Sequence, residues 1–213
     1  MSLKNSHTTA DYLEWGQLTN LILRLYRDKD YKMSLLISVA TFCLLRISDV
    51  LNMKYADLIF MEEDGTYNVK NEIILFEKKT KKKRIIPINE TLQKHILDCF
   101  ENLQGRKKDL SEYIFTSAKR CVYTVQAINR KLKIIKVKYG LKISNFSTHT
   151  FRKSGARHIF EKHSENNNGQ LAIVHLMSIL GHSSPEVSLR YIAIRQSEIK
   201  NSFEFMYFEK KRG

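Results

Sequence analysis

The strongest constraint on the fold is the change of hydrophobic period along the chain, from helical to strand-like and back to helical. Apolar residues recur at helical spacing across residues 11–53, which indicates two or three helices with a break near Lys29-Asp30. Three short apolar or β-branched runs follow, at Leu58–Met61, Glu72–Phe76 and Arg84–Ile88. Turn-like and lysine-rich segments separate them, which favours a small antiparallel three-stranded sheet.

The rest of the chain returns to helical spacing. The expected helices are Glu90–Leu103, Val122–Tyr139, Thr148–Phe160, Leu171–Leu180, Pro185–Tyr191 and Ser197–Phe208. The stretch Ser164–Gly169 has no apolar residue, so we expect an exposed loop there. A chain of 213 residues with 43% hydrophobic content can bury one sizeable core. We therefore predict a mostly helical α+β fold and a single domain over residues 1–213.

The charge balance limits the class of partner. Lysine and arginine number 36 against 22 acidic residues, a net charge of +14, which indicates DNA, RNA or an anionic membrane surface. No apolar run approaches the roughly 20 residues that span a bilayer, and Met1–Tyr12 lacks the apolar stretch of a signal peptide. We expect a soluble, cytoplasmic protein associated with the nucleoid. Cys43, Cys99 and Cys121 are interpreted as small core residues in a reducing compartment, and no zinc pattern is present.

An arginine interrupts the apolar pattern at the end of the first helical region. Arg46 follows a strongly apolar run, Ser48 can cap the next helix, and Asp49 would lie in its first turn, where the helix dipole favours an acid. We expect Arg46 to be half buried. On this segment alone, a structural pair between Arg46 and Asp49 is as good an interpretation as a functional arginine.

A histidine and an arginine lie three residues apart further along. His149 and Arg152 fall on a predicted helix and therefore share a face. A histidine can move protons near neutral pH, and an arginine fork matches two phosphate oxygens. Such pairs are common by chance on helix surfaces, so this one gains meaning only from its neighbours.

The most specific local pattern is a helix stop followed closely by a helix start. Gly181 fits the position just after a helix, Ser184 fits an N-cap, and Pro185 fits the first helical position. This geometry would hold His182 in the break and place Tyr191 about two turns along the next helix. The alternatives are a capping histidine and a tyrosine of the core or surface.

In their order along the chain, these residues resemble the catalytic set of the phage integrase or tyrosine recombinase family, which runs Arg, Lys, His-x-x-Arg, His or Trp, Tyr. The matching positions are Arg46, His149, Arg152, His182 and Tyr191. The family's lysine lies in a turn between two strands, before a strand that ends like Ile-Pro-Ile. Here Lys78–Arg84 precedes Pro87, and the offset favours Lys79, with Lys81 as the second choice. The resemblance covers about residues 10–205.

The resemblance implies a tyrosine recombinase catalytic-domain fold and an enzyme that cuts and rejoins DNA. Tyr191 would attack the scissile phosphodiester and store it as a 3′-phosphotyrosine, with His149 as the acceptor of its proton. Lys79 would protonate the departing 5′ oxygen.

The remaining polar groups would stabilise the reacting phosphate. Arg46 and Arg152 would clamp the non-bridging oxygens, and His182 would add a hydrogen bond to the same phosphate. Because these cations carry the electrostatic role that metal ions have elsewhere, we expect no metal and no cofactor.

The resemblance also predicts the partners. We expect double-stranded DNA, a tetramer on two duplexes, and a C-terminal helix within residues 195–213 that docks on a neighbouring protomer, with packing on its own core as the alternative. The family's separate N-terminal DNA-clamping (core-binding) domain would be absent or removed. The basic residues expected to contact DNA phosphates are Lys78, Lys81, Lys82, Lys83, Arg84, Arg130 and Lys131. The alternatives for the last set are lysines and arginines on a solvated face.

The leading functional hypothesis is site-specific recombination or integration, for instance by the integrase of a mobile element. One alternative keeps the site but changes the outcome, as in a type IB topoisomerase-like nicking-closing enzyme. The other is a DNA-binding relative that has lost catalysis, against which the presence of all six polar groups argues.

Overall fold

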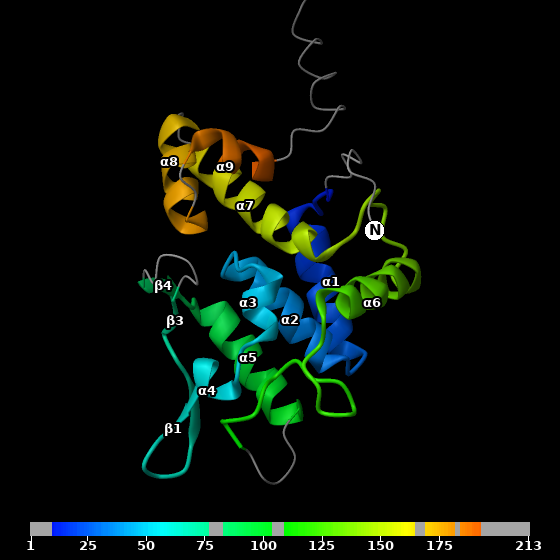
Figure 1. The fold of residues 1–213 in the computed structure, drawn as a ribbon, viewed down its shortest axis with the longest axis vertical. Helices are drawn as coiled ribbons and strands as arrows, with labels where there is room; N and C mark the ends of the chain where they lie inside the picture. Colours follow the sequence, from blue (N-terminus) through cyan, green and yellow to red (C-terminus); the bar gives the residue numbers. More distant parts are fainter. Residues whose placement is uncertain (1–9, 77–82, 104–108, 165–168, 182–183, 193–213) are drawn as a thin grey trace, which may run out of the picture.

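A computed structural model of the chain describes residues 10–76, 83–103, 109–164, 169–181 and 184–192 (Figure 1). Its helices are α1 Trp15–Arg27, α2 Tyr31–Phe42, α3 Ile47–Leu51, α4 Tyr55–Leu58, α5 Glu90–Leu103, α6 Val125–Lys138, α7 Thr148–Ser164, α8 Gly169–Leu180 and α9 Pro185–Ile192. Its strands are β1 Ile59–Met61, β2 Tyr67–Val69, β3 Glu72–Phe76 and β4 Lys83–Pro87. The predicted mostly helical α+β class is confirmed. The predicted tail helix and most of the Ser164–Gly169 loop lie outside the described residues.

The predicted three-stranded sheet is wrong, because the strands form two separate antiparallel pairs. β1 pairs with β2 and β3 pairs with β4. Only Lys70 and Asn71 separate β2 from β3, and the pairing partner changes between them. The Lys70 N–H donates to the Leu58 carbonyl at 2.8 Å, whereas the Asn71 carbonyl accepts from the Ile88 N–H at 2.8 Å. β2 escaped prediction because three residues are too few to show a strand period.

The main core lies around α2, which Figure 1 shows between α1 and α5. Residues 33–41 of α2 are buried without interruption, so this helix is covered on all sides. α1 is amphipathic instead, since Leu18, Leu21 and Leu25 are buried and recur at helical spacing. These contacts make α2 the rigid support for the chain segment that follows it.

A second, smaller cluster joins α7, α8 and α9, which Figure 1 shows packed together at one end of the molecule. It consists of Leu44, Ala156, Leu176, Leu180 and Ile192. Leu44 belongs to the turn after α2, so this cluster attaches the three C-terminal helices to the central helix. Each member lies within four residues of a residue predicted from the sequence to be catalytic, apart from Leu176.

Some local predictions need correction. Cys43 and Cys99 are buried as predicted, but Cys121 is exposed, because it lies in the turn closed by the bridge between Thr116 and Val122. α6 starts at Val125 and not at the predicted Val122, since Thr124 caps it by accepting from the Ala127 N–H at 3.2 Å. Over the described ranges, no helix has both the length and the apolar character needed to cross a bilayer.

Candidate active site

Arg46 lies at the turn between α2 and α3. The chain passes through Leu44 with a positive φ of 49° and reaches Arg46, which is the N-cap residue of α3. The Arg46 side chain is exposed, so its predicted half-burial is wrong. Ser48 is not the cap, because it lies inside α3, where its hydroxyl donates to the Asp49 carboxylate at 3.4 Å. No ion pair joins Arg46 to Asp49, both of which the structure describes.

α7 presses against that same turn at a glycine. A Cβ at Gly155 would lie 2.5 Å from the Thr41 carbonyl oxygen and 2.5 Å from Cδ2 of Leu44. Glycine therefore permits a backbone approach that any other residue would obstruct. Arg46 follows Leu44 by two residues, and Arg152 precedes Gly155 by less than one helical turn. The contact brings the two predicted arginines to the same junction of α2 and α7.

The N-terminal segment fixes the rotation of α7 about its axis. The Ser154 hydroxyl accepts from the Leu13 N–H at 2.8 Å, and the Lys153 ammonium donates to the Ala10 carbonyl at 2.8 Å. The rings of Trp15 and His158 are stacked with centroids 4.1 Å apart. They join α7 to residues more than 130 positions earlier in the chain, so no local sequence pattern predicts them.

Arg152 joins α7 to the break after α8. The residue is 2% exposed, and its Nη2 donates to the Leu180 carbonyl at 2.9 Å. Burying a charge is costly unless it is hydrogen-bonded, and a helix C-terminus offers both unsatisfied carbonyls and a negative dipole end. α8 ends at Leu180, and Gly181 has a φ of 65°, as predicted for the residue after a helix. Arg152 is therefore held beside the break that contains His182.

His182 lies outside the described residues, so its position remains a prediction. Tyr191 lies in α9, which starts at Pro185 as predicted, although its side chain is also outside the described part. Ile192 is buried in the smaller cluster, and its carbonyl accepts from Arg157 Nη1 at 3.2 Å.

Arg157 is a positioning group that sequence reasoning missed. Its Nε bonds to Glu161 one turn along α7, and its guanidinium lies 5.1 Å from the centroid of the Tyr12 ring. The i,i+4 spacing to Glu161 is a visible signal of a helical ion pair. The bond to the Ile192 carbonyl spans 35 residues, and no local pattern encodes it.

β4 also contacts the C-terminal end of α8, the end that Arg152 binds. Arg84 Nη2 donates to the Ile179 carbonyl at 2.5 Å. A cleft of about 330 Å³ lies between Arg84–Pro87 and the residues Ser178, Ile179 and Gly181. The strand that follows the lysine run therefore faces the break after α8. Of that run, Lys83 is described and exposed, whereas Lys78, Lys79, Lys81 and Lys82 lie outside the described residues.

α6 carries the other basic residues predicted to contact DNA. Arg130 is exposed, and Lys131 is partly buried with its ammonium 5.3 Å from the centroid of the Tyr123 ring. Asn129, next to them, accepts from the Thr148 N–H at 3.0 Å and so caps the start of α7. α6 is thus tied to the end of α7 that carries His149.

The environment of His149 favours its neutral form. The residue is exposed overall, but partial burial of its ring lowers the pKa of His149 below its ordinary value of 6.5. The charges of Lys153 and Arg152 lower the pKa further. A neutral imidazole at physiological pH can accept a proton, as a general base must.

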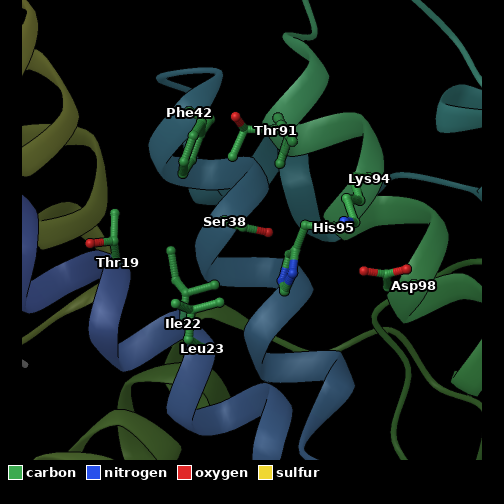
Figure 2. A pocket seen from close by; sticks show the side chains of 10 residues that line it. Thr19, Ile22, Leu23, Ser38, Phe42, Thr91, Lys94, His95 and Asp98 are labelled. Atoms are coloured by element: carbon green, nitrogen blue, oxygen red, sulfur yellow. The ribbon is translucent and has the colours of Figure 1, made fainter.

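Two other features lie apart from this site. An apolar pocket of about 290 Å³ is lined by side chains of α1, α2 and α5, including Ile22, Phe42 and His95, and by none of the predicted catalytic residues (Figure 2). The rings of His163 and His175 are in edge-to-face contact, with centroids 5.0 Å apart. In the part of the chain that the structure describes, no three His, Cys, Asp or Glu side chains are grouped to hold a metal ion.

Comparison of the sequence with known proteins gives a family and a relative. Residues 14–198 match the family model described as "Phage integrase family". The chain is 30% identical over 162 residues to the "Probable integrase/recombinase YoeC" of Bacillus subtilis (strain 168), with 75% of this chain and 76% of that protein covered.

Solved structures share the fold. The chain resembles XerA recombinase with a TM-score of 0.67 and 20% identity, covering 95% of this chain and 66% of that one. It resembles XerH site-specific recombinase, solved with palindromic difH substrate as a post-cleavage complex, with a TM-score of 0.61 and 21% identity. That match covers 96% of this chain and 56% of XerH, so the chain spans little more than half of that protein.

Proposed function

Since the chain belongs to the phage integrase family of tyrosine-type site-specific recombinases, we propose that it cleaves and rejoins double-stranded DNA through a 3′-phosphotyrosine at Tyr191. The observation that carries this proposal is the buried guanidinium of Arg152 at the break after α8. Around that point the turn with Arg46, the strand with Arg84 and the helix with Tyr191 all meet.

The two arginines form the phosphate clamp. Arg152 is preorganised, because its bond to the Leu180 carbonyl and its burial fix the guanidinium before DNA arrives. Arg46 is exposed at the start of a helix and can close on the second side of the phosphate. Two guanidiniums neutralise charge on the pentavalent transition state, and loss of one such donor costs roughly 10²-fold or more in rate.

Tyr191 and His149 carry the covalent step. A tyrosine hydroxyl with an ordinary pKa of about 10 is a weak nucleophile at neutral pH, so a base must take its proton. His149 is suited to this task because its surroundings lower its pKa and keep it neutral. The tyrosine oxygen bonds to phosphorus as the bond to the 5′ oxygen breaks, and the phosphodiester energy is conserved in the new ester.

The departing 5′ oxygen needs a proton, and a 5′ hydroxyl must later attack the phosphotyrosine to rejoin the DNA. Lys79 is the proposed general acid that protonates the departing 5′ oxygen, with Lys81 as the alternative. A 5′ hydroxyl from the partner strand then attacks the phosphotyrosine and releases Tyr191, which restores the enzyme. His182 would donate a hydrogen bond to the same phosphate throughout.

Positive charge supports DNA binding, and self-association of the protein supports strand exchange between duplexes. The net charge of +14 and the exposed Arg130 favour contacts with DNA phosphates, and these contacts weaken as the salt concentration rises. We propose that recombination takes place in a tetramer on two duplexes, in which an apolar stripe of the tail docks on a neighbour; it consists of Phe203, Phe205, Met206 and Phe208. Packing of the tail on its own protomer is the alternative.

The test is a covalent adduct formed without metal. The full chain is incubated in EDTA with DNA duplexes that contain a nick near the scissile position, and protein–DNA adducts are resolved under denaturing conditions. We expect an adduct with the unmodified chain and none with Tyr191→Phe, a variant that keeps the ring. A chain that retards DNA but never forms an adduct would be a binding protein, and the proposal would be wrong. Products joined between two duplexes would separate a recombinase from a nicking-closing enzyme.

A further inference from the structure

The C-terminal end of α8 receives two arginines from different parts of the chain. Arg152 of α7 donates to the Leu180 carbonyl at 2.9 Å, and Arg84 of β4 donates to the Ile179 carbonyl at 2.5 Å. The last carbonyls of a helix have no partner within the helix, and the dipole makes that end negative. Two guanidiniums on consecutive carbonyls therefore cap α8 just before the turn at Gly181.

Arg84 lies on the less exposed face of its strand. Side chains alternate along a strand, so Arg84 and Ile86 share one face, while Lys83 and Ile85 share the other. Ile86 is buried, whereas Ile85 is 53% exposed and Lys83 is exposed as well. Lys83 is therefore exposed to solvent, whereas the Arg84 guanidinium bonds to another part of the chain, at the exposed end of α8.

We propose that Arg84 is a positioning residue that fixes β4 to the end of α8, in place of the DNA phosphate contact expected from its charge. This inference rests on the proposed function. The bond holds the Ile179–Gly181 segment from one side while Arg152 holds it from the other. Arg84 thereby sets the place of the turn from which α9, with Tyr191, departs.

The consequence is a defect in the chemical step without a matching loss of DNA affinity. When Arg84 is truncated, α8 loses one of its two caps, and the turn at Gly181 can shift relative to Arg152. A misplacement of this kind lowers the rate at saturating DNA. A phosphate contact behaves differently, because its loss weakens binding and lowers the salt slope of the affinity by about one unit.

The experiment compares Arg84→Ala, Arg84→Lys and Lys83→Ala in the full chain. Lys83 is the matched control, since it is adjacent, has the same charge and is exposed on the opposite face. Single-turnover adduct formation at saturating DNA and the dissociation constant across a salt series are measured for each variant. We expect Arg84→Ala to lower the saturated rate roughly tenfold or more, with the dissociation constant within about twofold of that of the unmodified chain. Arg84→Lys should restore part of the rate, because an ammonium can donate to the Ile179 carbonyl.

Two results would overturn the inference. In one, Arg84→Ala weakens binding and flattens the salt dependence more than Lys83→Ala does, with an unchanged saturated rate. In the other, Arg84→Ala matches the unmodified chain in both measurements. If the unmodified chain forms no adduct, the proposed function fails, and hydrogen exchange then tests Arg84 directly. Amides of residues 178–181 should exchange faster in Arg84→Ala than in Lys83→Ala, and equal exchange would refute the bond's role.

Discussion

The close approach of α7 to the turn after α2 makes Gly155 the sharpest structural test of how the arginines are brought together. In Gly155→Ala, the new Cβ would meet the Thr41 carbonyl oxygen and Cδ2 of Leu44, each at 2.5 Å. The leucine end can rotate away, but a backbone carbonyl cannot. α7 must therefore retreat by about 0.9 Å to reach the 3.4 Å of ordinary contact.

Two effects set the stability of this variant. Overpacking costs about 1–3 kcal/mol, and alanine is favoured over glycine inside a helix by about 0.8–1.0 kcal/mol. The expected net loss is about 1 kcal/mol, which lowers the melting temperature by only about 2–4 °C for a chain of this size. The protein stays folded, so activity can be measured.

The rate of adduct formation should fall far more than the stability of the fold. Arg152 lies on the helix that retreats, and Arg46 lies on the segment that stays with α2. A displacement near 1 Å between catalytic groups can cost roughly 10²-fold in rate. Single-turnover adduct formation at saturating DNA should therefore fall about 10²-fold, together with the small drop in melting temperature.

The matched control is Gly16→Ala in α1, where an added Cβ meets nothing within 4 Å. That variant should keep the full rate and gain up to about 1 kcal/mol of stability. If Gly155→Ala behaves like Gly16→Ala in both rate and melting temperature, the contact between α7 and the turn after α2 does not position the arginines.

Three further substitutions test separate parts of the site. Arg46→Ala should lower adduct formation roughly 10²-fold but shift the unfolding free energy by less than about 0.5 kcal/mol, since the side chain is exposed; a large loss of stability in denaturant unfolding would contradict this. Because the pKa of His149 is lowered, the rate of adduct formation should stay constant as the pH falls to about 6.5 and should decline only below that pH. Lys153→Gln removes a nearby positive charge, which raises the pKa of His149 and moves the decline to higher pH. A pH–rate profile that does not move in this variant would exclude His149 as the base. Ser154→Ala leaves the Leu13 N–H without its 2.8 Å acceptor and should cost about 1–3 kcal/mol in thermal unfolding; a cost near zero would show that the N-terminal segment does not fix α7.

The parts of the fold that local pattern encodes were predictable. Helical spacing located the main helices, and the Gly181 and Pro185 signals placed the end of α8 and the start of α9 correctly. The composition of a single segment could not show which other segments it pairs with or packs against. The pairing change between β2 and β3 depends on hydrogen bonds to Leu58 and Ile88, which lie outside both strands.

In the candidate site, too, the order of the residues could be predicted from the sequence, but their contacts and exposure could not. The order of Arg46, His149, Arg152 and Tyr191 was visible in the sequence, and it led to the family that the comparisons confirm. The exposure of Arg46 was predicted wrongly, because an apolar run does not reveal that the N-cap residue of α3 is exposed between the buried Leu45 and Ile47. The capping bond of Arg84 crosses 95 residues, a relation that only the tertiary fold creates.

Tyr191 is the proposed nucleophile, and peptide mapping of the covalent adduct identifies the side chain that is bonded to DNA. Trypsin cleavage after Arg190 and Arg195 releases residues 191–195, in which Tyr191 carries the only nucleophilic side chain. Mass spectrometry of nuclease-trimmed adduct should find the phosphodiester remnant on that peptide. A remnant on any other peptide, with residues 191–195 unmodified, would contradict the mechanism.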